Sequence, residues 1–299
     1  MKNNLLTIVK KLYFFRGKVL MFISKQQFII LFGVIFIIFS NFVYDYQGQI
    51  IGRIPILYEY TQKNNARYLI DSNQSSRIFP HRVDSIGKLK DIWNNGFRSF
   101  EVDVRFGDNN TSKFFIGHNL GDSKITLEKF LSSIKYNNIE RVWLDFKNLN
   151  KDNYKDASIR LEYLDRKFKI KNKFIVESGN KMQFFKFFNI SGWHTSYYMP
   201  TNIVKLIKEH KNIEMEQLSL KISKQVKMQN VSAISFDSRL YPFVKKYMEP
   251  KISKNIVYHI WYAPFLASFN FKSELLSNKL FLDERVKTLL TIYRSKFNI

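Results

Sequence analysis

The stretch SFEVDVRFGDNNTSKFFIGH, residues 99–118, decides the fold that we expect for this chain. Glu101 and Asp103 stand two apart in a largely apolar run, and side chains two apart on a strand point the same way. A turn, GDNNTS, follows, and the short run KFFIGH then reads as another strand that ends at His118. The stretch therefore predicts a strand followed by a hairpin, raised on a loop at one end of a parallel sheet.

Around this segment, β-branched or aromatic runs alternate with amphipathic stretches from residue 78 onward. Strands are expected at 78–82, 99–106, 141–146, 174–177, 193–198, 231–236, 256–261 and 288–293. Helices are expected at 85–95, 127–136, 154–168, 181–189, 202–213, 239–248 and 271–276. This alternation is typical of an α/β fold of the (β/α)8 TIM-barrel type. A doubly wound open sheet is the alternative, but no G-x-G-x-x-G motif follows the first strand.

Ahead of the barrel lies an uncharged apolar stretch, FIILFGVIFIIFSNFV, residues 28–43. With its flanks it approaches the ~20 residues that cross a bilayer as a helix, so we predict a transmembrane signal anchor at 27–46. Residues 1–26 contain basic residues but no acid, which predicts a cytoplasmic N-terminus. The barrel, 78–299, would then lie outside the cytoplasmic membrane, periplasmic or extracellular, on a stalk at 47–77. The alternatives are a cleaved signal peptide, which lacks a small-x-small site here, and a buried core helix, which is seldom apolar on every face.

Composition narrows the function classes. The 299 residues are 45% apolar and 16% aromatic, which excludes an intrinsically disordered chain. The absence of cysteine excludes a disulfide framework, a zinc–thiolate site and a cysteine nucleophile. Lys and Arg number 48 against 25 Asp and Glu, and the net charge of +23 suits an anionic lipid surface or an anionic substrate. An AT-rich coding sequence would raise the Lys content without any partner and is the alternative explanation.

Unusual polar residues stand where the predicted strands end. They are His81 with Arg82, Glu101 with Asp103, His118 on the hairpin, and Asp145 with Lys147. Because chemistry in a barrel collects where the strands end, we expect these side chains to converge at one mouth. Three carboxylates that converge repel one another unless a cation joins them, and hard oxygen ligands suit Mg²⁺ or Ca²⁺.

The basic residues of this set suit a phosphate. Arg82 can act as a bidentate fork and Lys147 as a point charge, while His81 and His118 can serve as base or nucleophile and as general acid. Each residue also has an ordinary explanation: a hydrogen-bonded structural histidine, a solvated carboxylate pair or a surface ion pair. The co-occurrence of all of them favours the catalytic interpretation.

These motifs resemble the glycerophosphodiester phosphodiesterase-like branch of the phospholipase-C-like phosphodiesterase barrels. That family has HR after strand one, E-x-D on strand two, a hairpin that ends in HD, and D/E-x-K on strand three. The motifs match here over residues 80–147, and the strand–helix alternation extends the similarity to about residue 295. The resemblance implies a metal-dependent phosphodiesterase with two catalytic histidines. Its metal ligands would be Glu101, Asp103 and Asp145.

Three departures from the family pattern bear on the substrate. HRG is here HRV, with Val83, and HD is His118-Asn119. The family's metal-binding Glu of an E-N pair is missing, and Asp84-Ser85 stands nearby instead. This loss moves the site toward the sphingomyelinase-D-like and menorin-like branches, in which Asp145 would supply the third ligand.

Later strand ends carry further candidates. Glu177 and Asp237 could either bind or cap a loop, and Trp261 could pack on a head group or lipid chain or belong to the core. His194 and His259 are expected to be structural, and Asp84-Ser85 and Thr126 are expected to be helix caps.

The sequence thus predicts a membrane-anchored, metal-dependent phosphodiesterase that acts on a phospholipid head group or an envelope glycan. The alternative is a catalytically inactive barrel that serves as a binding or assembly module in envelope or polysaccharide biogenesis. Nucleic acid is not an expected partner, because the basic residues are spread along the chain and form no recognition helix.

Overall fold

The computed structural model describes residues 75–107, 111–179, 182–261 and 279–291, together with residues 293 and 295. The predicted cytoplasmic N-terminus and anchor, the stalk up to residue 74 and the predicted helix at 271–276 lie outside these residues. Within the described residues, no helix is both long enough and apolar enough to cross a bilayer.

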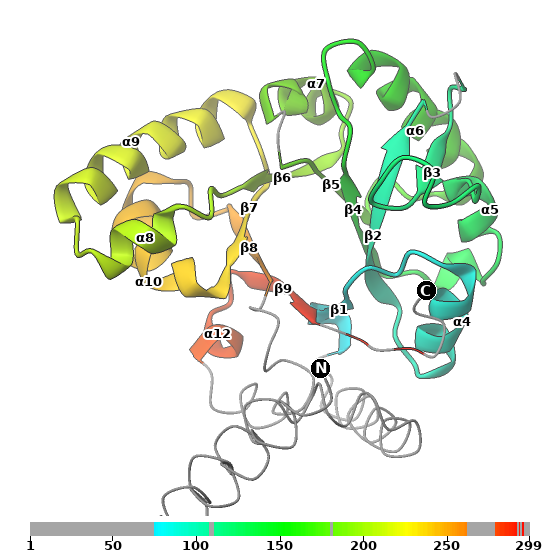
Figure 1. Cartoon of the computed structure of the whole chain (residues 1–299), viewed down its shortest axis with the longest axis horizontal. Helices are drawn as coiled ribbons and strands as arrows, with labels where there is room; N and C mark the ends of the chain where they lie inside the picture. Colours follow the sequence, from blue (N-terminus) through cyan, green and yellow to red (C-terminus); the bar gives the residue numbers. More distant parts are fainter. Residues whose placement is uncertain are drawn as a thin grey trace, which may run out of the picture. The chain divides into compact units, whose positions relative to one another are not determined.

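Nine strands of the described chain form one curled sheet, in the order β1-β9-β8-β7-β6-β5-β4-β2-β3 (Figure 1). They are β1 Ile78–Pro80, β2 Ser99–Phe106, β3 Phe114–Ile116, β4 Arg141–Phe146, β5 Phe174–Glu177, β6 His194–Tyr198, β7 Ala233–Asp237, β8 Val257–Trp261 and β9 Val286–Thr291. All neighbouring pairs are parallel except β2 with β3, the predicted hairpin. The mixed α/β architecture and the curl of the sheet are consistent with a TIM-like barrel.

The helices lie outside the curled sheet in Figure 1. They are α4 Ile86–Asn94, α5 Leu127–Leu131, α6 Tyr154–Phe168, α7 Phe185–Ile190, α8 Ile203–Lys208, α9 Asn212–Gln229, α10 Tyr241–Phe243 and α12 Lys279–Leu282. Two predicted caps are confirmed: Ser85 Oγ accepts a hydrogen bond from the Lys88 amide at 3.1 Å, and Thr126 Oγ1 accepts one from the Lys129 amide at 3.2 Å.

β1 and the loop after it meet β2, and this contact, which we call the seam, completes the curl of the sheet. Within the described chain, no ladder of backbone hydrogen bonds joins the two strands. The Val83 amide donates to the Glu101 carbonyl at 2.9 Å, and the Asp103 amide donates to Asp84 Oδ1 at 3.0 Å. β3 pairs with the end of β2, from Val104 to Phe106. The hairpin and the loop after β1 therefore cover the edge of β2, and the loop meets it at the two predicted carboxylates.

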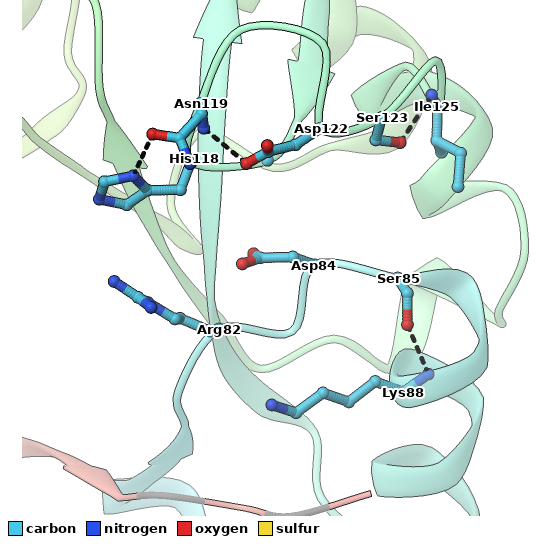
Figure 2. Close-up of a pocket in the computed structure, with 10 residues that line it drawn as sticks. Arg82, Asp84, Ser85, Lys88, His118, Asn119, Asp122, Ser123 and Ile125 are labelled. Atoms are coloured by element: carbon cyan, nitrogen blue, oxygen red, sulfur yellow. Dashed lines mark hydrogen bonds between the residues drawn. The ribbon is translucent and has the colours of Figure 1, made fainter. Parts of the chain in front are cut away.

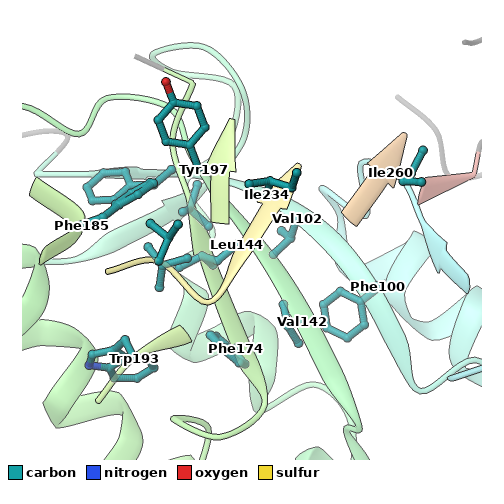
Figure 3. Close-up of a cluster of buried hydrophobic side chains, with 14 of the residues drawn as sticks. Phe100, Val102, Val142, Leu144, Phe174, Phe185, Trp193, Tyr197, Ile234 and Ile260 are labelled. Atoms are coloured by element: carbon teal, nitrogen blue, oxygen red, sulfur yellow. The ribbon is translucent and has the colours of Figure 1, made fainter. Parts of the chain in front are cut away.

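The two faces of the sheet bury different side chains. Phe100, Val142 and Phe174 belong to a large apolar cluster that also contains residues of the surrounding helices (Figure 3). Burying each such side chain contributes roughly 1.5–3 kcal/mol. On the opposite face, the rings of Trp143 on β4 and His259 on β8 lie 5.3 Å apart although these strands are not neighbours. The second face therefore encloses the interior of the curl.

Helix α9 was not predicted, and the expected helix at 202–213 is wrong in extent. α8 ends at Lys208, and His210 adopts a left-handed conformation with φ of 53° before α9 begins. The cause lies in the pattern of α9: Ile213 and Leu220 are 73% and 54% exposed, so its apolar residues do not mark one face. The first strand is also shorter than predicted, because Arg82 is left-handed with φ of 53°.

Candidate active site

Three carboxylates meet at the carboxyl end of β4 and the adjoining middle part of β2. Asp103 and Asp145 are in register on the two strands, and Glu101 lies two residues before Asp103 on the same face. One oxygen from each of the three lies within 4.8 Å of the others. Glu101 is 1% exposed, and its Oε1 has no hydrogen-bond partner within the described chain. The predicted convergence of these carboxylates is confirmed.

Lys147 neutralises part of this acidic group. Its Nζ lies 2.5 Å from Asp145 Oδ2 and 2.9 Å from Asp103 Oδ1. Burial opposes its charge, yet the two carboxylates raise the pKa of Lys147 above its ordinary value. The D-x-K motif is therefore an inward-facing ion pair and not a surface pair.

One ammonium does not balance the charge of the group. Burial raises the pKa of Glu101 well above its ordinary value, and repulsion from Asp103 adds to this. Burial also raises the pKa of Asp145, against the opposing effect of Lys147. A divalent cation would allow all three carboxylates to ionise, and their oxygens are the ligands that Mg²⁺ and Ca²⁺ prefer. The residues present therefore fit a divalent metal ion.

His81 and Arg82 approach the carboxylates from the loop after β1. His81 Nε2 lies 3.6 Å from Glu101 Oε2, and its side chain is 38% exposed. The left-handed conformation of Arg82 turns its amide toward Glu101 Oε2, to which it donates at 2.5 Å. The Arg82 side chain is 56% exposed, with Nε 3.7 Å from Asp103 Oδ2, so its guanidinium can meet an anion. Val83, where the family has Gly, is fully buried in the outer core.

His118 is held in the loop that follows β3. Its Nδ1 lies 3.1 Å from Asn119 Oδ1, an oxygen that can only accept, so this hydrogen bond forms when Nδ1 carries the proton and directs Nε2 to the other side of the ring. The Asn119 amide in turn donates to Asp122 Oδ2 at 2.6 Å. Gly117 has φ of +131°, and a Cβ there would lie 2.8 Å from the Cβ of Asp122. Asn119 therefore orients His118 although it lacks the charge of the family's Asp.

The remaining site candidates, Glu177, Asp237 and Trp261, lie in different surroundings. Glu177 is in register with Asp145 and is 1% exposed beside the carboxylates. Asp237 accepts two hydrogen bonds from the Arg239 side chain, at 2.9 and 2.7 Å, and one from its amide, which favours the capping role. Trp261 stacks on Tyr198 with ring centroids 4.9 Å apart and packs against the interior cluster, which favours the core role.

Of the three remaining histidines, the sequence predicts a structural role for two, His194 and His259. His194 is exposed at the start of β6, the opposite end of the strands. His259 is fully buried inside the sheet against Trp143. Neither position contradicts the structural roles expected for them.

Sequence reasoning misassigned Asp84 and overlooked Lys88. Asp84 does not cap α4; it accepts the Asp103 amide and so positions a carboxylate of the group. Lys88 is 6% exposed, and its Nζ donates to the His81 carbonyl at 2.9 Å. The first turn of a helix is an unfavourable place for a cation, because the helix dipole is positive there. The lysine at this position is the signal in the sequence that points to a role for Lys88.

A pocket opens beside the carboxylates between the loop after β1 and the loop after β3 (Figure 2). Its volume is about 890 Å³. It is lined by Arg82, Asp84, Ser85, Lys88, Gly117, His118, Asn119, Asp122, Ser123 and Ile125. The side chains of Arg82 and Asp84 extend toward that of His118 across the pocket in Figure 2.

No protein-family model matches the chain, and no curated protein matches its sequence. Solved structures match its fold. A glycerophosphodiester phosphodiesterase from Parabacteroides distasonis is 12% identical, with a TM-score of 0.48 over 72% of this chain and 92% of that one. A candidate glycerophosphodiester phosphodiesterase from Galdieria sulphuraria is also 12% identical, with a TM-score of 0.48 over 72% of this chain and 93% of that one. The likeness to these proteins concerns the fold alone.

Proposed function

We propose that this chain is a metal-dependent phosphodiesterase, built on a (β/α)8 barrel, that uses His81 and His118 for acid–base catalysis. The observation that carries the proposal is the convergence of two buried carboxylates and one half-buried carboxylate with two cations and two histidines at one end of the sheet. Lys147 and Arg82 supply positive charge beside the carboxylates, as a phosphodiester requires. A barrel interior is normally filled with apolar side chains, so buried acids at this end call for a function.

The carboxylates of Glu101, Asp103 and Asp145 would hold a divalent cation, Mg²⁺ or Ca²⁺. When bound, such an ion supplies charge neutralisation to a phosphoryl group. Asp84 positions Asp103 through its amide, and the Arg82 amide holds Glu101 Oε2. The seam between β1 and β2 therefore positions Glu101 and the backbone of Asp103.

The histidines divide the proton transfers. His81, beside Glu101, accepts a proton from the attacking water as the new P–O bond forms. For the second transfer His118 must carry a proton on both ring nitrogens: it donates the Nε2 proton to the departing alkoxide as the other P–O bond breaks, and it keeps the Nδ1 proton on Asn119 Oδ1. Arg82 and Lys147 bind the non-bridging phosphate oxygens. Each histidine is then restored by exchange with solvent.

The location of the barrel is part of the proposal. The apolar stretch at 28–43 and the basic residues ahead of it support a single-pass anchor with the barrel outside the cytoplasmic membrane. The net charge of +23 supports association with an anionic lipid surface. External protease added to intact cells, or to cells whose outer layer has been permeabilised, should remove a C-terminal tag; a tag cleaved only after lysis would contradict this orientation.

The catalytic proposal is tested by hydrolysis of bis(p-nitrophenyl) phosphate by the full chain in detergent, with Mg²⁺, Ca²⁺ or EDTA. We expect metal-dependent turnover that falls by about 10²–10⁴ in His81→Ala and in His118→Ala. His194→Ala, at the far end of the strands, is the matched control and should keep full activity. Equal activity in all four proteins would contradict the two-histidine mechanism. Metal binding without any turnover would favour the inactive binding module.

A further inference from the structure

The pocket between the β1–α4 loop and the loop after β3 lies next to the carboxylates but is made mostly of other residues (Figure 2). Its volume of about 890 Å³ is near the upper end of the roughly 300–1,000 Å³ of small-molecule pockets. It shares Arg82 and His118 with the proposed catalytic residues. A group attached to the reacting phosphate can therefore extend into it.

The side chains in this pocket offer both acceptors and donors. Asp84 and Asp122 each use one carboxylate oxygen for a backbone amide, and within the described chain the second oxygen of each makes no hydrogen bond. Lys88 Nζ gives one hydrogen bond to the His81 carbonyl and has two further N–H donors. Asn119 uses its Oδ1 for His118, which leaves its Nδ2 group as a donor.

This combination suits hydroxyl groups, because each hydroxyl donates one hydrogen bond and accepts others. It does not suit the other groups that a phosphodiester can carry. A second anion would meet Asp84 and Asp122. A quaternary ammonium group would meet Arg82 and Lys88 and would find no Phe, Tyr or Trp among the described residues that line the pocket. An acyl chain would find Ile125 as the one apolar side chain of that lining.

We propose that this pocket binds an uncharged sugar carried on the reacting phosphate, with Asp84, Lys88, Asn119 and Asp122 as its hydrogen-bonding residues. The inference rests on the proposed function and narrows it: the substrate is a sugar phosphodiester, as in an envelope glycan, and not a choline-type lipid head group. Asp122 matters most, since it lies in the same loop as His118 and has an oxygen open to the pocket.

The test compares three methyl phosphodiesters, those of the 6-hydroxyl of glucose, of choline and of ethanol, with the full chain in detergent. Phosphorus NMR follows the loss of each diester, so cleavage on either side of the phosphate is counted. We expect kcat/KM for the glucose diester to exceed that for the ethyl diester about tenfold, which corresponds to roughly 1.4 kcal/mol, and the choline diester to be the slowest. Asp122→Asn should bring the glucose-to-ethyl ratio close to one. Asp152→Asn changes an exposed aspartate in a different loop and should leave the ratio as in the wild type.

The outcomes separate the pocket from the proposed function. Hydrolysis with no preference for glucose, a preference for choline, or a ratio that Asp122→Asn does not change would overturn the sugar site and leave the phosphodiesterase standing. Failure to cleave any of these diesters or bis(p-nitrophenyl) phosphate, with any metal, would overturn the phosphodiesterase and the sugar site with it.

Discussion

The outer face of the sheet packs against the helices and the inner face lies inside the curl, and the two faces bury different kinds of side chain. On the outer face, Phe100, Val142 and Phe174 are fully buried and pack in the large apolar cluster. On the inner face, the apolar cluster has four buried members within the part of the chain that the structure describes: Phe79, Trp143, Ile175 and Leu290. Buried inner-face atoms without a hydrogen-bond partner in the described chain include Ser99 Oγ, Glu101 Oε1, Trp143 Nε1, both ring nitrogens of His259, and Thr288 Oγ1.

Under the proposed function, this difference separates the residues that stabilise the fold from those that would bind the metal ion and the substrate. An unpartnered buried polar atom costs about 1–3 kcal/mol, so a set of them on one face is a considerable loss of stability. Burial of apolar side chains on the outer face offsets that loss of stability. The proposed function accounts for the carboxylates of the inner face, because a bound metal ion would neutralise them.

The largest expected effect tests the outer face. Phe174→Ala should lower the free energy of unfolding by about 3–5 kcal/mol, because it removes a fully buried ring and leaves a cavity. Chemical denaturation followed by circular dichroism measures this change. A loss below ~1 kcal/mol would mean that the outer cluster does not carry the stability of the sheet.

An outer carboxylate provides the next largest effect. Asp283 accepts hydrogen bonds from the Tyr241 hydroxyl at 2.8 Å, the Arg285 amide at 2.9 Å and Lys245 Nζ at 3.1 Å. Burial opposes its ionisation, yet these donors lower the pKa of Asp283 below its ordinary value of 3.8. This is the reverse of Glu101 on the inner face, whose pKa is raised.

Asp283→Asn should therefore cost about 2 kcal/mol at pH 7, the value of a charged hydrogen-bonded group. Because the pKa is lower in the folded chain, this contribution is present above pH 3.8 and is lost as the pH falls through the folded pKa. Unfolding free energies of wild type and variant should converge below that range. A difference that stays constant from pH 7 to pH 3 would contradict the assigned partners.

Removing a carboxylate of the inner face should stabilise the metal-free protein, whereas removing Asp283 destabilises it. Glu101→Gln should raise the free energy of unfolding in EDTA at pH 7 by about 1 kcal/mol. A carboxyl whose pKa is raised by burial and by Asp103 destabilises the folded chain above pH 4.5, and the glutamine amide, of the same shape, has no such cost. Adding Mg²⁺ should raise the melting temperature of the wild type and not that of the variant. A destabilised variant in EDTA would show that Glu101 serves the fold.

The sequence predicted the inner face well because its signals are local. The alternation of Glu101 with Asp103, and of Asp145 with Lys147, follows from the two-residue period of a strand, and the register of β2 with β4 then joins the two pairs. Asp84 was read as a helix cap because its partner, the Asp103 amide, lies across the seam. The seam itself depends on the left-handed conformation of Arg82. Arginine has no preference for that conformation, so the sequence does not predict it.

The smallest effect concerns the surface outside both faces. Ile190 ends α7 and is 78% exposed, so Ile190→Ser should change the free energy of unfolding by less than about 0.5 kcal/mol. The same denaturation measurement applies. A larger loss would show that this helix end is covered in the full chain, and the outer apolar layer would then extend further than the cluster around Phe174.

The central claim is that the inner carboxylates hold a metal ion that phosphodiester hydrolysis requires. The most direct measurement is the rate of bis(p-nitrophenyl) phosphate hydrolysis as Mg²⁺ or Ca²⁺ is titrated into metal-stripped full chain, for wild type and Asp103→Asn side by side. We predict a saturable rise from near zero in the wild type and a loss of at least about 100-fold in the variant. Turnover that persists in EDTA and in Asp103→Asn would contradict the claim.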